Sequence, residues 1–177
     1  MKTVYCLLAF CLSLLLSSCE FNCSIGKKEE EKGSAKVKEG ARVYNNIQLT
    51  TNGVKVDKAF LLLANGQRVP DDNFVGFNGT VKMQIYIDSG WTVENGKVKL
   101  GASEKIIAEN GDILVDEPDM FQKYADGLSV EDAKSMYLSA ILEQKKDAPP
   151  TSVTVAFKIW DKMGTGFVEG TYQLFSR

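Results

Sequence analysis

Five Asn-Gly pairs follow one another through the chain at intervals of 13 to 17 residues, and they constrain its fold more than any other feature. Both residue types tolerate a positive φ angle, which the type I′ turn of a β-hairpin requires at its two central positions. One such pair is weak evidence, but five with apolar segments between them favour a series of hairpins in an antiparallel β protein. The pairs begin at Asn52, Asn65, Asn78, Asn95 and Asn110.

The segments between these pairs alternate apolar and polar residues, as strands with one buried face do. In residues 81–88 the odd positions are apolar and the even positions are polar or amphipathic, and residues 151–160 repeat this period of two. Residues 42–49 and 168–174 follow the pattern less regularly. Residues 60–63 are all apolar, which predicts a central strand that is covered on both faces. The sequence therefore predicts a mainly β domain, an antiparallel β-sandwich.

One segment breaks this pattern and predicts a short helical insertion over residues 117–146. A first helix is expected to have Pro118 in its first turn and to end at Gly127. Ser129 and Asp132 then have the spacing of a capping box, and apolar residues follow at helical spacing. This apolar stripe consists of Val130, Ala133, Tyr137, Ala140 and Ile141. We expect the stripe to pack against the end or the face of the sandwich.

The start of the chain resembles the signal peptide of a bacterial lipoprotein. Lys2 supplies a positive charge, residues 4–16 form a short apolar segment, and Ser17 and Ser18 precede Cys19. The resemblance implies cleavage before Cys19 and acylation of both its thiol and its freed amine, so that several acyl chains hold the protein in a lipid bilayer. An ordinary secretory signal and a retained membrane-spanning helix are the alternatives, although the apolar segment is shorter than the roughly 20 residues of a span.

This interpretation divides the chain into three parts. Residues 1–18 are the signal peptide, residues 19–40 hold the lipidated cysteine and a charged tether, and residues 41–177 form the sandwich domain with its helical insertion. Residues 27–39 contain five lysines and four glutamates and almost nothing apolar, so this tether cannot bury enough surface to fold. The expected location is the bacterial cell envelope at the outer membrane, with the surface-facing and periplasm-facing orientations both open.

Composition excludes several classes of function. The chain has no histidine, which excludes Ser-His-Asp catalysis and histidine-ligated zinc. A net charge of −2 with both signs mixed along the chain argues against nucleic-acid binding. No cofactor is expected. All of the cysteines lie in or beside the signal, so the folded domain has neither a disulfide nor a thiolate metal site. They are Cys6, Cys11, Cys19 and Cys23.

Two groups of acidic residues are candidates for metal binding or catalysis. They are Asp112, Asp116, Glu117 and Asp119, and Asp71 with Asp72. Acids on loops between strands supply the oxygens that Ca²⁺ requires, but acids also stabilise the first turn of a helix, and we expect the latter role for Asp116 and Glu117. Two carboxylates on opposite sides of a cleft would instead serve a glycoside hydrolase.

Three aromatic residues are candidates for binding a ligand: Trp160, Trp91 and Tyr86. Tyr86 shares the outward face of its strand with Lys82 and Gln84. Exposed rings on a β face can stack on sugar rings or pack against a partner protein. Trp160 falls on the polar side of its strand, where it is either exposed or covered by the helical insertion.

Two resemblances accompany these observations. Residues 157–170 resemble the strand-loop-strand of a calcium-dependent C2 domain, but Asp161 stands alone in the loop, so no set of calcium ligands is implied. Residues 41–177, with their Asn-Gly pairs, the preceding charged tether and the ending Val168-Glu169-Gly170-Thr171-Tyr172, resemble small envelope lipoproteins of Bacteroidetes. The lipoprotein resemblance implies an immunoglobulin-like sandwich and no catalytic residue, whereas the resemblance of residues 157–170 implies a C2-like sandwich.

Taken together, these features favour a membrane-anchored, non-catalytic module that binds or assembles with a protein or a glycan. A carboxylate-dependent enzyme that acts on glycans is one alternative, and a calcium-dependent C2-like binding domain is another. An enzyme needs acids that converge in one concave pocket, whereas a binding module presents a flat or grooved aromatic patch.

Anchoring is expected to depend on Cys19, because the chain beyond it has no apolar stretch long enough to hold a membrane. The Cys19→Ala variant should leave the membrane fraction after washing with salt and carbonate, as detected by immunoblotting of the fractions. Full retention of this variant in the washed membranes would contradict the lipid anchor.

Overall fold

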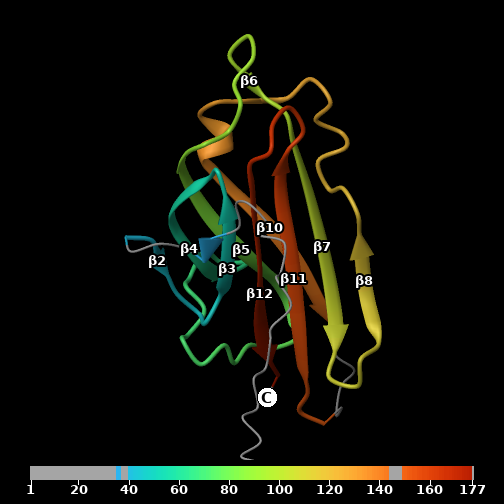
Figure 1. The fold of residues 1–177 in the computed structure, drawn as a ribbon. Helices are drawn as coiled ribbons and strands as arrows, with labels where there is room; N and C mark the ends of the chain where they lie inside the picture. Colours follow the sequence, from blue (N-terminus) through green and yellow to red (C-terminus); the bar gives the residue numbers. More distant parts are fainter. Residues whose placement is uncertain (1–34, 37–39, 144–148, 177) are drawn as a thin grey trace, which may run out of the picture. The chain divides into compact units, whose positions relative to one another are not determined.

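The computed structural model describes residues 35–36, 40–143 and 149–176. The chain forms two units, Met1–Glu31 and Lys32–Arg177, and the first unit, with Cys19, lies outside the described residues. Within the second unit, two sheets pack face to face around one hydrophobic core (Figure 1). The predicted antiparallel β-sandwich is therefore confirmed. In the described ranges, no helix is long and apolar enough to cross a membrane.

The larger sheet has six strands in the order β1-β3-β12-β11-β7-β8, and each is antiparallel to its neighbours. Its strands are β1 (Ala35–Lys36), β3 (Gln48–Asn52), β12 (Phe167–Phe175), β11 (Ser152–Asp161), β7 (Leu100–Ala108) and β8 (Ile113–Glu117). Along β11 every second side chain is buried, and these side chains are the ones that the alternation predicts. They are Val153, Val155, Phe157 and Ile159.

The smaller sheet has four strands in the order β10-β5-β4-β2. Its strands are β10 (Ser135–Glu143), β5 (Asn78–Ser89), β4 (Lys55–Leu63) and β2 (Arg42–Val43), of which β2 is parallel to β4. A separate pair is formed by β6 (Lys97–Val98) and β9 (Leu128–Ser129). The prediction that residues 60–63 are covered on both faces is wrong. Leu61 is fully buried, whereas Phe60 and Leu62 are only half-buried on the outer face of β4.

The predicted helical insertion over residues 117–146 is wrong in its described part, apart from one short turn. The later part of this segment forms β10, in which Met136, Leu138, Ala140 and Leu142 face the core and Ile141 is 67% exposed. These inward residues recur with a period of two, which is the period of a strand. All nine residues of β10 pair with β5, so β10 is a hydrogen-bonded neighbour of β5.

Only one turn of 3₁₀ helix, Asp132–Lys134, remains of the insertion. The capping-box residues are present at its start, because the Asp132 amide donates to Ser129 Oγ over 3.0 Å. The Ser129 hydroxyl in turn donates to the Asp132 carboxylate over 2.7 Å. Residues 144–146 lie outside the described residues.

Three of the five Asn-Gly pairs turn hairpins, as predicted. Asn95-Gly96 has positive φ at both residues (51° and 73°), and the flanking residues exchange two backbone hydrogen bonds of 2.9 Å. In Asn65-Gly66 and Asn110-Gly111 only the glycine has a positive φ, which is typical of a type I turn followed by a bulge. Asn52-Gly53 instead leads from β3 in one sheet toward β4 in the other, and Asn78-Gly79 begins β5.

A buried pair of asparagines joins the two sheets at one end. Asn45 accepts a 2.9 Å hydrogen bond from the Leu61 amide in β4 and donates to the Val69 carbonyl and to Asn73 Oδ1, each over 3.0 Å. Asn73 donates to the Gln173 carbonyl in β12 over 2.8 Å. Asn45 and Asn73 are each 2% exposed, so these bonds replace water and hold β4, β12 and the loop between β4 and β5 together.

The assignment of residues 135–143 to a strand predicts opposite effects of substitution at neighbouring positions. Leu138 is 1% exposed, so Leu138→Ala should lower the free energy of unfolding by about 2–5 kcal/mol. The side chain of Ile141 is largely in water, so Ile141→Asp should change it by less than about 1 kcal/mol. Urea unfolding of both variants measures this. A large loss of stability in Ile141→Asp would favour the helix over the strand.

Candidate ligand-binding surface

The three aromatic residues that the sequence offers as ligand-binding candidates lie in three different places. Trp160 lies on the outer face of the six-stranded sheet, Tyr86 lies on the outer face of the four-stranded sheet, and Trp91 follows β5. They therefore do not form one site.

Trp91 has a structural role. Its ring is half-buried and packs against the core, and its indole Nε1 donates a 3.3 Å hydrogen bond to the Ala133 carbonyl. Trp91 thereby fastens the loop after β5 to the 3₁₀ turn before β10.

Trp160 lies flat over Gly101 of β7. A Cβ atom at Gly101 would lie 2.2 Å from two atoms of the indole ring, so the glycine makes room for that ring. In the next row of the same sheet, Lys158 Nζ is 4.4 Å from the centroid of Phe167 and 2.9 Å from the Glu169 carboxylate. The positive charge on this face of the sandwich is thus balanced by an adjacent carboxylate.

Aromatic and lysine side chains gather on the outer face of the four-stranded sheet. Tyr86 and Phe60, on neighbouring strands, stack with their ring centroids 6.2 Å apart and their planes inclined by 17°. Lys58 Nζ lies 4.6 Å from the Phe60 centroid and 5.8 Å from that of Tyr86, which is a cation–π arrangement with both rings.

The same surface continues onto β10. Tyr137 is paired with Gln84 of β5, which is itself paired with Phe60 of β4. Lys82 Nζ lies 4.9 Å from the Tyr137 centroid. Gln84 Nε2 donates to the Met136 carbonyl over 3.0 Å. We call this surface the aromatic–lysine face, and it consists of Lys58, Phe60, Lys82, Gln84, Tyr86 and Tyr137.

The aromatic–lysine face carries unbalanced positive charge. Neither Lys58 nor Lys82 has a carboxylate within 4.0 Å among the described residues, and none of the six side chains of the face is acidic. Tyr137 is 54% exposed and Tyr86 is 37% exposed, so two rings are open to solvent beside the two ammonium groups.

Sequence reasoning found only the β5 part of this face. The alternation along one strand predicts that Lys82, Gln84 and Tyr86 point outward, and all three lie on the outer face of β5 in the structure. Phe60 was expected to be covered, and Tyr137 was assigned to a helix. The alternation of Met136 and Leu138 with their neighbours is one signal for a strand that would place Tyr137 on the outer face, but the helical spacing of Tyr137 and Ala140 competes with it.

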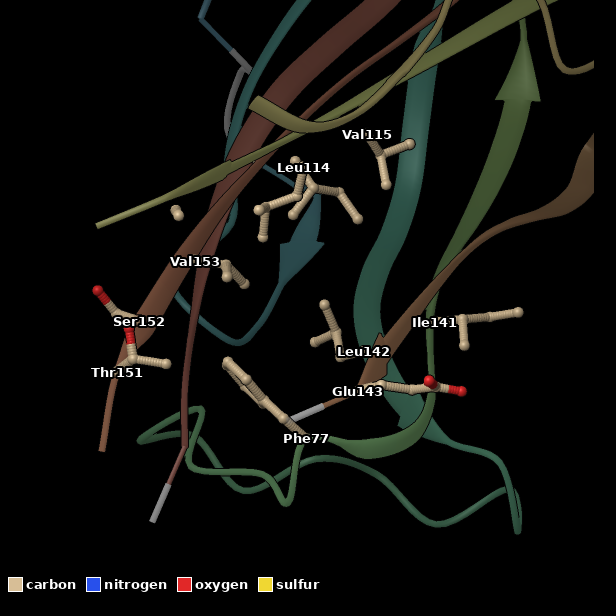
Figure 2. Close-up of a pocket in the computed structure, with 11 residues that line it drawn as sticks. Phe77, Leu114, Val115, Ile141, Leu142, Glu143, Thr151, Ser152 and Val153 are labelled. Carbon is tan, nitrogen blue, oxygen red and sulfur yellow. The ribbon is translucent and has the colours of Figure 1, made fainter. Parts of the chain in front are cut away.

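An apolar cavity of about 330 Å³ opens at the side of the sandwich where β8 and β10 end their sheets. Figure 2 shows Phe77, Leu114, Leu142 and Val153 around a common space, whereas Ile141 extends away from it. The lining of the cavity includes one carboxylate, that of Glu143. Residues 144–148 follow Glu143 in the chain and lie outside the described residues. The lining of the cavity is thus mostly apolar, with Glu143, Thr151 and Ser152 as its polar residues.

The acidic residues have separate partners. The expectation that Asp116 and Glu117 stabilise the first turn of a helix is wrong, because both residues lie in β8. Asp116 forms a 2.9 Å ion pair with Lys105 there. Asp119 Oδ1 accepts a hydrogen bond of 3.0 Å from the Phe121 amide, and Asp71 pairs with Arg68. In the ranges that the structure describes, no three acidic or cysteine side chains are grouped as metal ligands.

Comparisons with known proteins add little. No family model matches the sequence, and no curated protein matches it. Among solved structures, the chain is similar to one described as the C-terminal domain of wzt, at 14% sequence identity and a TM-score of 0.47. The similarity covers 79% of this chain and 82% of that chain, and no conclusion about function rests on it.

A buried acid lies on the inner face of the six-stranded sheet, away from these surfaces. Glu104 is 4% exposed and Tyr172 is 2% exposed, and they point into the core from the two strands that flank β11. Within the described residues, neither Glu104 Oε1 nor the Tyr172 hydroxyl has a hydrogen-bond partner. Burial raises the pKa of Glu104 to about 7, because the core solvates a carboxylate poorly.

The stability of the domain should therefore fall as the pH rises. The Glu104 carboxyl titrates near 4.5 when unfolded and near 7 when folded, so the folded protein binds more protons between these values. The loss should total roughly 3 kcal/mol, since each unit of pKa difference corresponds to about 1.4 kcal/mol. Urea unfolding at pH 5 and pH 8 measures it.

Glu104→Gln should remove most of this dependence and exceed the wild type in stability at pH 8. Glu117→Gln is the matched control, because Glu117 is paired with Glu104 in the sheet but is exposed. An unchanged pH profile in Glu104→Gln would show that this carboxyl is not responsible.

Proposed function

We propose that the protein is an envelope lipoprotein, anchored to the outer membrane through acylated Cys19, and that its sandwich is a non-catalytic module that binds a glycan. The single observation that supports a glycan ligand is the aromatic–lysine face. The lipid bilayer is one partner and the glycan is the other, and the proposed activity requires neither a metal nor a cofactor.

The chemistry of this face suits a sugar ring. One side of a pyranose ring presents C–H groups, and the face of an aromatic ring carries negative potential that attracts them. The hydroxyl groups around the edge of the sugar need polar partners, because an unpaired polar group costs free energy when water is removed. Tyr86 and Tyr137 supply rings, while Gln84 and the two lysines supply donors beside them.

Binding without catalysis is favoured by the absence of acids from the face. Hydrolysis of a glycosidic bond generally uses two carboxylates on either side of that bond. The aromatic–lysine face offers none, and Asp71 and Asp116, one from each acidic group, are occupied by ion pairs with Arg68 and Lys105. A calcium-bridged mode of binding would need oxygens that the face does not supply.

The proposal predicts that binding of polysaccharides depends on an exposed ring of β10. Full-length protein in non-ionic detergent is applied to a panel of immobilised acidic and neutral polysaccharides, and binding is measured by biolayer interferometry. Tyr137→Ala should weaken binding by about tenfold or more, as loss of a stacking ring does, and Tyr137→Phe should retain most of it.

Phe167→Ala is the control, because Phe167 also has a lysine beside its ring (Lys158 Nζ, 4.4 Å from the centroid), but it lies on the opposite face of the sandwich. Equal binding by the wild type and Tyr137→Ala would refute the proposed site. A different result would point to a protein partner at the apolar cavity. In that case Leu114→Arg would lose binding to a protein ligand, and Tyr137→Ala would retain it.

A further inference from the structure

We infer that the glycan is acidic and that Lys58 and Lys82 bind its negatively charged groups. This inference rests on the proposed function and names the class of ligand that the same face selects. It depends on the positions of the two lysines, on their lack of carboxylate neighbours and on a contrast with the opposite face of the sandwich.

The two lysines lie at opposite ends of the rings. Lys58 is paired with Tyr86 of β5, and Tyr86 is four residues from Lys82 along the same strand. At a rise of about 3.3 Å per residue, the backbone positions of the lysines are about 13 Å apart along the strand direction. Gln84 and Tyr137 lie between them in register. The backbones of the two lysines therefore flank a polar and aromatic centre, and their ammonium groups lie over Phe60 and Tyr137, the two ends of its central row. A chain of sugars can lie across such a surface.

Both ammonium groups lack the partner that a lysine on a folded surface commonly has. Lys58 and Lys82 are half-buried, and each lies over an aromatic ring, which partly replaces water around the charge. A carboxylate or sulfate group from a ligand would add a charge-assisted hydrogen bond without displacing an existing ion pair. The chain as a whole has a net charge of −2, so this positive face is a local feature.

The opposite face of the sandwich shows the same motif in a neutralised form. Lys158 also lies over an aromatic ring, that of Phe167, but its ammonium group is 2.9 Å from the Glu169 carboxylate. An anionic ligand would have to compete with Glu169 there. The contrast assigns anion binding to the four-stranded sheet and gives a matched control for its test.

A charged bilayer is a less suitable occupant of this face. Attraction to anionic lipids typically takes clusters of about four to eight basic residues, whereas this face has two.

The test compares lysine variants on a panel of acidic polysaccharides, including polygalacturonate, alginate and hyaluronate. Fully methyl-esterified polygalacturonate provides the same backbone without charge, and dextran is a second neutral probe. Full-length protein in non-ionic detergent should bind at least one acidic polysaccharide. Its dissociation constant should rise by about tenfold in Lys58→Gln and in Lys82→Gln, and should rise steeply at about 0.5 M salt.

Lys158→Gln should bind as the wild type does. Binding to neutral polysaccharides alone, or equal binding to polygalacturonate and its methyl ester, would overturn the acidic ligand while leaving the glycan module intact. Absence of binding to every polysaccharide would overturn both. Lysine-dependent binding to wells coated with phosphatidylglycerol, without binding to any polysaccharide, would identify the face as a membrane contact and would also overturn the inference.

Discussion

Two facing layers of apolar side chains are buried between the sheets, and their burial fixes how the strands pair. Leu61, Met83 and Ile85 of the smaller sheet and Val155 and Ile159 of the larger sheet are completely buried. Fully burying one such side chain stabilises the fold by about 1.5–3 kcal/mol, so the pairing register of each strand is strongly fixed. A shift of one residue would exchange the inner and outer rows. The inner rows therefore determine which side chains form the outer faces.

The aromatic–lysine face is a consequence of this register. Phe60, Gln84 and Tyr137 come from three strands and form one row because β4, β5 and β10 are aligned by their buried neighbours. Along each strand the functional candidates alternate with core residues, so the site lies on strands whose other face is packed in the core. A site built on paired strands keeps its geometry better than one built on loops, which suits recognition of a repeated ligand.

The alternation along single strands was sufficient to predict the sandwich and the outward direction of Tyr86. It was not sufficient for residues 135–143, because Ala140 fits both a helical stripe with Tyr137 and a strand pattern with Leu138. Pairing with β5, a contact between segments about fifty residues apart in sequence, decides between them. That pairing determines which residues lie beside Tyr86 on the neighbouring strands. Most of the candidate site therefore could not be predicted from the sequence.

Mapping the bound ligand on the two outer faces of the sandwich shows whether the aromatic–lysine face is the binding site. Backbone amide chemical shifts of the protein in detergent are recorded during titration with an oligosaccharide of the acidic polysaccharide that it binds. The largest shifts are expected on β4, β5 and β10, around Phe60, Gln84 and Tyr137, and no shifts are expected on β11 and β12. Shifts concentrated around Trp160 and Phe167 on the six-stranded sheet, or around Leu114 at the apolar cavity, would contradict this binding site.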